Sequence, residues 1–274
     1  MTFKFFIDTA DHSYIEEKWK FLNRFVSKKH MVGITTNPNA FMKENLHTDK
    51  QWETRTRTLA ELVTKIREDN KGVVYVQIPG DNLSEEKVLQ WATMVSGWGD
   101  GQTKIALKLP PYKKYLDMVA TLSKTIDINI TGVADCGTAL KCLQSKVRYV
   151  SIIPGRMEEV GIDAKAHVSF VMNAHHEKAK WDIITGSMRT LEGLKWCVEQ
   201  RTIPTIGKKI IDLITEENAK EVFSIKPASE SLKDLNSFAP VTEEKSKILS
   251  LQFFEQMNEC GNETAKEFLQ ETKM

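Results

Sequence analysis

The stretch Lys104-Ile105-Ala106-Leu107-Lys108-Leu109-Pro110 is a short apolar run that stops at two consecutive prolines. This pattern predicts a buried β-strand, and because side chains alternate along a strand, Ala106 and Lys108 share one face. If the other face packs against helices, Lys108 points to the centre of a sheet or barrel. An amine held there loses hydration, its pKa falls, and it can attack a carbonyl carbon. Taken alone, a lysine at a strand end more often reaches water. Whether Lys108 is a buried nucleophile therefore depends on the pattern of the rest of the chain.

Length and composition favour one large enzyme-sized domain. The chain has 274 residues, 41% of them hydrophobic, which is a size that α/β barrels reach as single domains. Its 38 Lys and Arg against 37 Asp and Glu provide no electrostatic argument for a nucleic-acid or membrane partner. The start of the chain does not resemble a signal peptide, and no stretch is long and apolar enough to span a membrane.

The cysteine and histidine patterns do not indicate a metal or a cofactor. The four cysteines are widely spaced, as expected for reduced thiols in a cytoplasmic protein. The adjacent His175 and His176 lie on a predicted helix, where neighbouring side chains diverge, so a shared metal ion is not expected. We therefore expect a cytoplasmic protein that needs no metal and no cofactor.

Short apolar runs alternate with longer helical patterns along the chain, which is typical of a parallel sheet. The predicted strands cover residues 3–8, 31–35, 73–79, 104–110, 126–131, 149–153, 181–185 and 201–206. Predicted helices lie between them, over about 13–26, 48–69, 84–95, 113–124, 136–144, 164–179 and 190–199. Eight such units most economically close into an α/β fold of the (β/α)8 TIM barrel type, with a doubly wound open sheet as the alternative.

The chain divides into two predicted regions. Residues 1–222 form the barrel, and residues 223–274 form a C-terminal helical extension with a helix over about 242–273. The apolar face of that helix must pack on the barrel or on another subunit, so a homo-oligomer is possible.

Polar side chains stand at or just after the C-terminal ends of the predicted strands. They are Asp8, Asn37, Gln77, Lys108, Asn129, Thr131, Ser151, Arg156, Ser187 and Arg189. Barrel enzymes build their active sites at this rim, where loops bring side chains from many strands together. Any one of these residues could instead cap a helix or shape a turn, Asp8 included. Their recurrence over seven strands, with a lysine on the fourth, favours an active site.

Several motifs occur in an order and spacing that resemble the transaldolase family. They are Ile7-Asp8-Thr9-Ala10, Gly33-Ile34-Thr35-Thr36-Asn37-Pro38, Ala106-Leu107-Lys108-Leu109-Pro110, Asn129-Ile130-Thr131, Tyr149-Val150-Ser151 through Gly155-Arg156, and Ser187-Met188-Arg189. The resemblance covers about residues 3–206, and the tail beyond matches only loosely.

The resemblance implies a Schiff-base mechanism without a cofactor. Lys108 would attack the C2 carbonyl of a ketose phosphate, and Asp8 would remove the C4 hydroxyl proton so that the C3–C4 bond breaks. The dihydroxyacetone unit left on Lys108 would pass to an aldose phosphate. The substrates would be sedoheptulose 7-phosphate, fructose 6-phosphate, glyceraldehyde 3-phosphate and erythrose 4-phosphate, all sugar phosphates of the pentose phosphate pathway.

The resemblance also assigns binding roles. Asn37, Asn129 and Ser151 match residues that hold the hydroxyl groups of the three-carbon unit, and Thr131 matches a residue that positions the catalytic water. Ser187, Arg156 and Arg189 would bind the phosphate, a role that forked, permanently charged donors also suit on physical grounds. A single arginine is more commonly paired with a surface carboxylate.

Two positions depart from the family pattern. Most transaldolases carry Glu where this chain has Gln77, and an amide can orient water but cannot accept its proton. Gln at this position resembles the fructose-6-phosphate aldolase branch, which however places Tyr where this chain has Ile153. A simple aldolase, or a sugar-phosphate-binding barrel without catalysis, therefore remains an alternative to a transaldolase.

Overall fold

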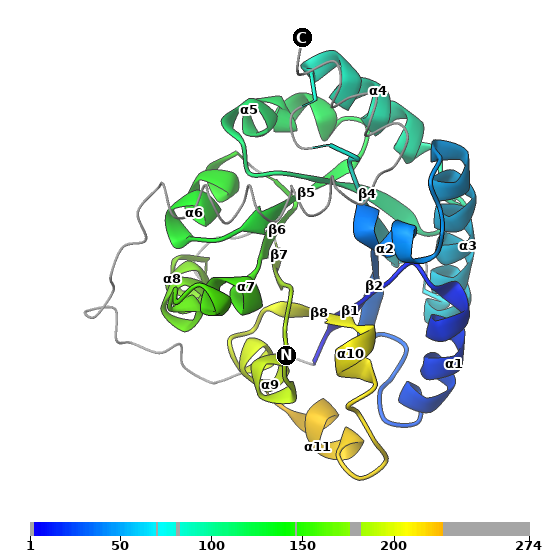
Figure 1. Cartoon of the computed structure of the whole chain (residues 1–274), viewed down its shortest axis with the longest axis vertical. Helices are drawn as coiled ribbons and strands as arrows, with labels where there is room; N and C mark the ends of the chain where they lie inside the picture. The colour runs from blue at the N-terminus through cyan, green and yellow to red at the C-terminus, as the bar shows by residue number, and fades with distance from the viewer. Residues whose placement is uncertain (1–2, 70, 81–82, 146, 176–181, 227–274) are drawn as a thin grey trace.

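Eight parallel strands close into a barrel in the computed structural model, which describes residues 3–69, 71–80, 83–145, 147–175 and 182–226. Each strand pairs with its neighbours in the chain, and β1 pairs with β8 (Figure 1). The strands are β1 (Phe5–Asp8), β2 (Met31–Thr35), β3 (Val73–Gln77), β4 (Lys104–Leu109), β5 (Asp127–Val133), β6 (Tyr149–Ile152), β7 (Asp182–Thr185) and β8 (Ile203–Gly207). The predicted (β/α)8 fold is confirmed, and the open-sheet alternative is wrong.

The long helices form a ring around the barrel, as predicted (Figure 1). They are α1 (His12–Leu22), α3 (Asp49–Arg67), α4 (Glu85–Ser96), α5 (Lys113–Leu122), α6 (Cys136–Gln144), α8 (Ala164–His175) and α9 (Leu191–Glu199). Several begin at side-chain caps, such as Ser84 before α4 and Asp135 before α6.

Four short helices among the described residues were not predicted, because four to six residues are too few for a helical repeat to be recognised. They are α2 (Pro38–Lys43), α7 (Pro154–Glu159), α10 (Lys208–Ile211) and α11 (Ala219–Ser224). The first two begin at prolines, which suit the first turn of a helix because their fixed φ is helical and no N–H is needed there. Together α2, α7 and α10 lie just after β2, β6 and β8, on the rim where the site residues were expected.

Strand alternation divides the apolar residues into two cores. Leu107 and its outward-facing neighbours pack against the helices in the larger core, while Ala106 belongs to a small core inside the barrel. The inner core is made of Phe6, Val73, Tyr75, Ala106, Tyr149, Ile184 and Ile203. Because these side chains fill the barrel below the level of Lys108, any cavity has to lie at the C-terminal ends of the strands.

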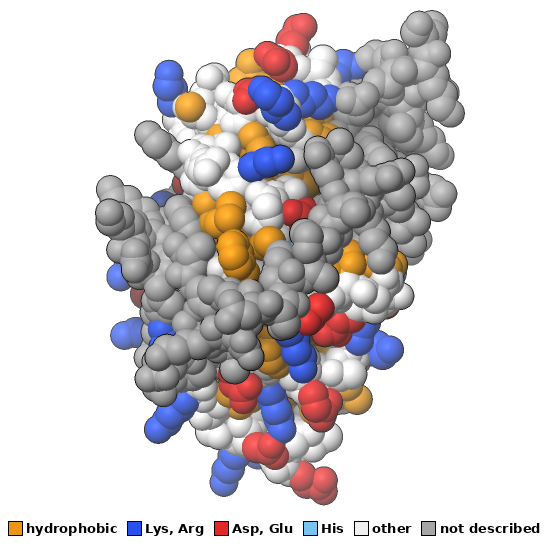
Figure 2. Space-filling view, turned by 90° about the vertical axis from the view of Figure 1, so that its left-hand side faces the viewer, with side chains coloured by type: hydrophobic (Ala, Val, Ile, Leu, Met, Phe, Trp, Pro, Cys, Tyr) orange, Lys and Arg blue, Asp and Glu red, His pale blue; other side chains and the backbone are white. Residues whose placement is uncertain are grey.

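The predicted C-terminal helix over 242–273 lies outside the described residues, as does His176. The helix α11 spans the predicted boundary between residues 222 and 223, and Phe223 packs against Phe3 with ring centroids 5.3 Å apart. None of the described helices has the length and apolar character needed to cross a membrane. On the face shown in Figure 2, acidic and basic side chains are interspersed, in agreement with the balanced net charge.

Candidate active site

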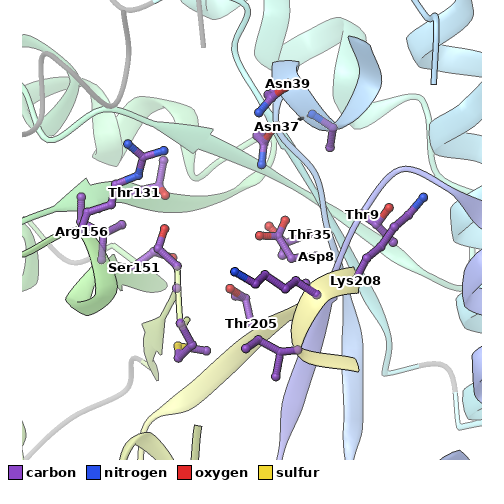
Figure 3. A pocket seen from close by; sticks show the side chains of 18 of the residues that line it. Asp8, Thr9, Thr35, Asn37, Asn39, Thr131, Ser151, Arg156, Thr205 and Lys208 are labelled. Carbon is purple, nitrogen blue, oxygen red and sulfur yellow. Dashed lines mark hydrogen bonds between the residues drawn. The ribbon is translucent and has the colours of Figure 1, made fainter. Parts of the chain in front are cut away.

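A cavity of about 450 Å³ opens at the C-terminal mouth of the barrel (Figure 3). Eight of the ten predicted site residues line it: Asp8, Asn37, Lys108, Thr131, Ser151, Arg156, Ser187 and Arg189. The other two, Gln77 and Asn129, are buried beside it. The barrel therefore brings together side chains from widely separated parts of the chain.

Strand register explains the arrangement of the deepest residues. Gln77 on β3 pairs with Lys108 on β4, and Lys108 in turn pairs with Asn129 on β5. Residues at the same level of neighbouring strands point to the same side of the sheet, which here is the barrel interior. Lys108 thus enters the cavity between two neutral amide side chains.

Lys108 is the buried cation of the site. Lys108 is only 6% exposed. Its Nζ donates hydrogen bonds to Thr35 Oγ1 at 3.1 Å and to the Thr36 carbonyl at 3.0 Å. Burial lowers the pKa of Lys108 to about 8, although the nearby charge of Asp8 acts in the opposite direction. With a pKa of about 8, about a tenth of the molecules carry a neutral, nucleophilic amine at pH 7.

Asp8 ends β1 and faces the same cavity. Its Oδ1 is buried and has no hydrogen-bond partner among the described residues. Burial raises the pKa of this carboxyl group, and the charges of Lys108 and Lys43 partly offset that effect. A carboxylate in such surroundings has spare capacity to accept a proton from a bound molecule.

The far wall of the cavity carries neutral hydrogen-bonding groups from β5 and β6. Ser151 Oγ donates to Asn129 Oδ1 at 2.9 Å, and both residues are buried. Thr131 pairs in register with Ser151, and just after it Gly132 takes a positive φ of 78° where the register shifts. Such a bulge re-aims the side chains beside it.

Asn37 reaches the cavity from the start of α2. Its Oδ1 accepts a hydrogen bond from the Ala40 N–H at 2.8 Å, which caps the helix. This bond occupies only the oxygen, so the Nδ2 donor can serve a bound molecule. In Figure 3 Asn37 lies above Asp8 and Thr35.

Gln77 lies one strand away from Lys108 and is 1% exposed. Its Oε1 is buried without a hydrogen-bond partner among the described residues. Unpaired buried acceptors of this kind are commonly satisfied by an ordered water. The amide could orient such a water but could not take its proton near neutral pH.

The anion-binding candidates meet where the loops after β6 and β7 touch. A Cβ atom at Gly155 would lie 1.8 Å from the Ser187 carbonyl oxygen, so only glycine permits this contact. Ser187 itself has a positive φ of 59°. The close approach brings Arg156 and Arg189 near enough that, besides burial, the charge of Arg189 lowers the pKa of Arg156.

A carboxylate balances one of these two arginines. Arg189 Nε donates to Glu159 Oε1 at 2.7 Å, and both side chains are about half exposed. Neutralising one arginine reduces the repulsion between the two, and the remaining N–H groups of Arg189 stay available to an anion. Sequence reasoning missed Glu159 because α7, on which it lies, was not predicted.

Other cavity residues were also missed. Thr35 lies inside a motif quoted from the sequence, and strand alternation could have placed it on the inner face, but nothing there pointed to a contact with Lys108. Lys208 follows β8 directly and is paired with Asp11 at 2.6 Å and Glu44 at 3.4 Å. In Figure 3 Lys208 and Arg156 lie on opposite sides of the site. Among the described residues, no three His, Cys, Asp or Glu side chains gather as they would around a metal ion.

Comparison with known proteins identifies the family. A family model described as transaldolase/fructose-6-phosphate aldolase matches residues 5–273, which extends beyond the 3–206 covered by the recognised motifs. A probable transaldolase 2 from Bacillus anthracis is 25% identical over 214 residues, covering 76% of this chain and 88% of that protein. A probable transaldolase from Clostridium botulinum (strain Loch Maree / Type A3) is 28% identical over 213 residues, covering 76% of this chain and 87% of that protein. Since the family model spans nearly the whole chain, the protein belongs to the transaldolase/fructose-6-phosphate aldolase family.

Proposed function

We propose that this protein is a transaldolase that moves a dihydroxyacetone unit between sugar phosphates through a Schiff base on Lys108. The observation that carries the proposal is the buried amine of Lys108, held in a cavity that it shares with Asp8. Burial keeps part of this amine neutral near physiological pH, which a carbonyl-attacking lysine requires. The donors would be sedoheptulose 7-phosphate or fructose 6-phosphate, the usual substrates of this step in the pentose phosphate pathway.

The first half of the reaction cleaves the ketose. The Lys108 amine adds to the C2 carbonyl, water leaves, and a protonated imine forms. Asp8 then takes the proton of the C4 hydroxyl, the C3–C4 bond breaks, and its electron pair moves into the imine to give an enamine. The C4 carbon leaves as the aldehyde of an aldose phosphate, and the three-carbon unit stays on Lys108.

The second half reverses these steps on an acceptor. The enamine carbon attacks the aldehyde of erythrose 4-phosphate or glyceraldehyde 3-phosphate, and Asp8 returns the proton to the new hydroxyl. Water, positioned by Thr131 and Gln77, then hydrolyses the imine and frees the new ketose. Asn37, Asn129 and Ser151 would hold the hydroxyl groups of the three-carbon unit throughout.

The phosphate would bind at the junction of the loops after β6 and β7. Arg156 and Arg189 supply two charges of the same sign, and Ser187 adds a hydroxyl group beside them. Phosphate sites of (β/α)8 barrels are frequently formed by the loops after the last two strands, which agrees with the part of this place that lies after β7.

The test is reductive trapping on Lys108. Borohydride added together with fructose 6-phosphate should leave a reduced sugar unit on Lys108, located by peptide mass spectrometry. The Lys108→Arg variant should lose the adduct, whereas Lys104→Arg, changed at the exposed start of the same strand, should keep it. An adduct on another lysine, or none, would refute the mechanism and favour a barrel that only binds sugar phosphates.

One observation favours a second function, a simple aldolase of the fructose-6-phosphate type. Gln77 gives the site no carboxylate to activate water, which departs from most transaldolases. Assays with fructose 6-phosphate separate the two functions. A transaldolase forms sedoheptulose 7-phosphate only when erythrose 4-phosphate is added, whereas an aldolase releases free dihydroxyacetone without any acceptor.

A further inference from the structure

The amine of Lys108 is held on one side of the cavity. Its two hydrogen bonds to described residues go to the end of β2, one to the Thr35 hydroxyl and one to the Thr36 carbonyl. No hydrogen bond or ion pair joins Lys108 to Asp8, although the two opposite charges share the cavity and act on each other. The two groups therefore share the cavity without a direct contact between them.

The attachment to β2 is rigid. Thr36 is fully buried, and its N–H and its hydroxyl both donate to the Tyr75 carbonyl on β3, at 2.9 and 2.7 Å. Thr35 is 3% exposed and lies at the same level as Asp8 in the β1–β2 pairing. Its β-branched side chain has few rotamers available within a strand, so its hydroxyl stays in place.

We propose that Thr35 is a positioning residue whose hydroxyl, together with the Thr36 carbonyl, tethers the Lys108 amine to β2 and prevents it from closing an ion pair with Asp8. This inference rests on the proposed function, because it concerns how the nucleophile and the base of that reaction are kept separate. Thr35 acts through Lys108.

The tether matters because an ion pair would disable both groups. Contact with a carboxylate favours the charged ammonium form, which raises the pKa of a lysine and removes its nucleophilic lone pair. The same contact would occupy the carboxylate that has to accept the substrate proton. Two neutral acceptors avoid both effects: they fix two N–H bonds without adding charge, and they leave the rest of the amine facing the cavity.

The obvious alternative is that the Thr35 hydroxyl only supplies a hydrogen-bond acceptor to the buried Lys108 amine. Under both explanations, removal of the hydroxyl lowers the stability of the protein. They differ in the direction in which the pKa of Lys108 then moves. If the tether prevents an ion pair, the Thr35→Val variant frees the amine to move to Asp8 and its pKa rises. If Thr35 is merely one acceptor, its loss leaves the pKa unchanged or lowers it, because the ammonium loses a partner.

Three single variants and one double variant separate these outcomes. Thr35→Val removes the hydroxyl at constant shape, Thr35→Ser keeps it, and Thr103→Val removes a buried threonine hydroxyl that pairs with Thr64 near the other end of β4. Folding of each variant is checked by circular dichroism. A Thr35→Val/Asp8→Asn double variant removes the carboxylate as well. Because the charge of Asp8 by itself raises the pKa of Lys108, the double variant is compared with Asp8→Asn alone, and the two should titrate at the same pH.

The experiment measures the reductive methylation of Lys108 by formaldehyde and cyanoborohydride between pH 6 and 10, with the site resolved by peptide mass spectrometry. We expect half-maximal labelling near pH 8 in the unaltered protein, in Thr35→Ser and in Thr103→Val, and an upward shift of about one pH unit or more in Thr35→Val. At pH 7, the same shift lowers kcat for transfer about tenfold, with little change in KM for fructose 6-phosphate.

A Thr35→Val profile that stays at the position of the unaltered protein, or moves to lower pH, would overturn the inference. So would an upward shift of the double variant relative to Asp8→Asn alone, because the carboxylate would then not be its cause. Methylation needs no sugar, so these results are separate from the proposed function, which fails if the unaltered protein forms no Lys108 adduct with fructose 6-phosphate.

Discussion

The two cationic sides of the cavity are built in opposite ways. On the side of β2 and β4, Lys108 is buried, and within the described part of the chain it bonds only to neutral oxygen atoms. On the side of β6 and β7, the Arg189 side chain is 44% exposed and bonded to the Glu159 carboxylate. The first cation makes no ion pair with the carboxylate of Asp8 in the same cavity, and the second is paired with a carboxylate.

The difference follows from what each cation would do in the proposed reaction. A nucleophile has to lose its proton, so burial without a counterion is useful even though it costs stability. A phosphate-binding group has to stay charged, and an exposed ion pair worth at most about 1 kcal/mol can exchange its partner for a bound anion. Substitutions at Asp8, Arg156, Lys108 and Gln77 test this contrast.

The largest effect is expected at Asp8. Replacing it in the Asp8→Asn variant leaves Lys108 able to form the imine but removes the proton acceptor for C–C cleavage. We expect the cleavage rate to fall by about 10²–10⁴-fold, the usual range for a lost general base, while borohydride trapping persists. Single-turnover cleavage of fructose 6-phosphate measures the effect. Asp182→Asn, at the opposite end of the barrel, is the control, and an unchanged rate in Asp8→Asn would exclude Asp8 as the base.

The next largest effect is expected at Arg156. The Arg156→Ala variant should lose about 2–4 kcal/mol in kcat/KM for phosphorylated acceptors, which is about 30- to 1000-fold, yet retain its activity towards unphosphorylated glyceraldehyde. The more exposed Arg189 should lose less in Arg189→Ala. Arg148→Ala, at the opposite mouth of the barrel, serves as the control. Equal losses on both acceptors would indicate that Arg156 supports the fold instead.

Burial of the Lys108 ammonium should be visible in stability. Its pKa is lowered from 10.5 to about 8, so the folded state disfavours the cation, and the full penalty applies below about pH 8. As the pH rises from about 8 towards 10.5, the folded state releases the proton first and the penalty disappears. Lys108→Met should therefore raise the free energy of unfolding by about 1–3 kcal/mol at pH 7, and by less at pH 9.5.

Urea unfolding at these two pH values measures that difference. Lys104→Met, four residues earlier with a side chain that is 73% exposed, should change the free energy of unfolding little at either pH. A Lys108→Met variant that is less stable than the unaltered protein at pH 7 would contradict the contrast between the two sides.

The smallest effect is expected at Gln77. If imine hydrolysis is slow because no carboxylate activates the water, Gln77→Glu should raise transfer to erythrose 4-phosphate about tenfold, which corresponds to about 1.4 kcal/mol of barrier. Phosphate affinity should not change, because Gln77 lies on β3 and the arginines follow β6 and β7. Unchanged or slower transfer in a coupled assay would place the aldolase function ahead of the transaldolase function.

Much of this arrangement could be predicted from the sequence alone. The alternation in residues 104–109 placed Lys108 on the inner face, and the order of apolar runs and helical patterns predicted the barrel. The polar residues at the strand ends then predicted the rim. These features are local, because strand alternation and helical periodicity depend only on neighbouring residues, and they sufficed to locate eight of the residues that line the cavity.

The contacts that distinguish the two sides of the cavity depended on tertiary structure. The bond from Lys108 to Thr35 joins residues that are 73 positions apart, and Glu159 meets Arg189 where Gly155 lets two loops touch. Strand register and loop packing set such distances, and neither has a periodic signal in the sequence. The sequence by itself therefore determined which groups stand at the rim, and the closed barrel decided which of them are paired and which are kept apart.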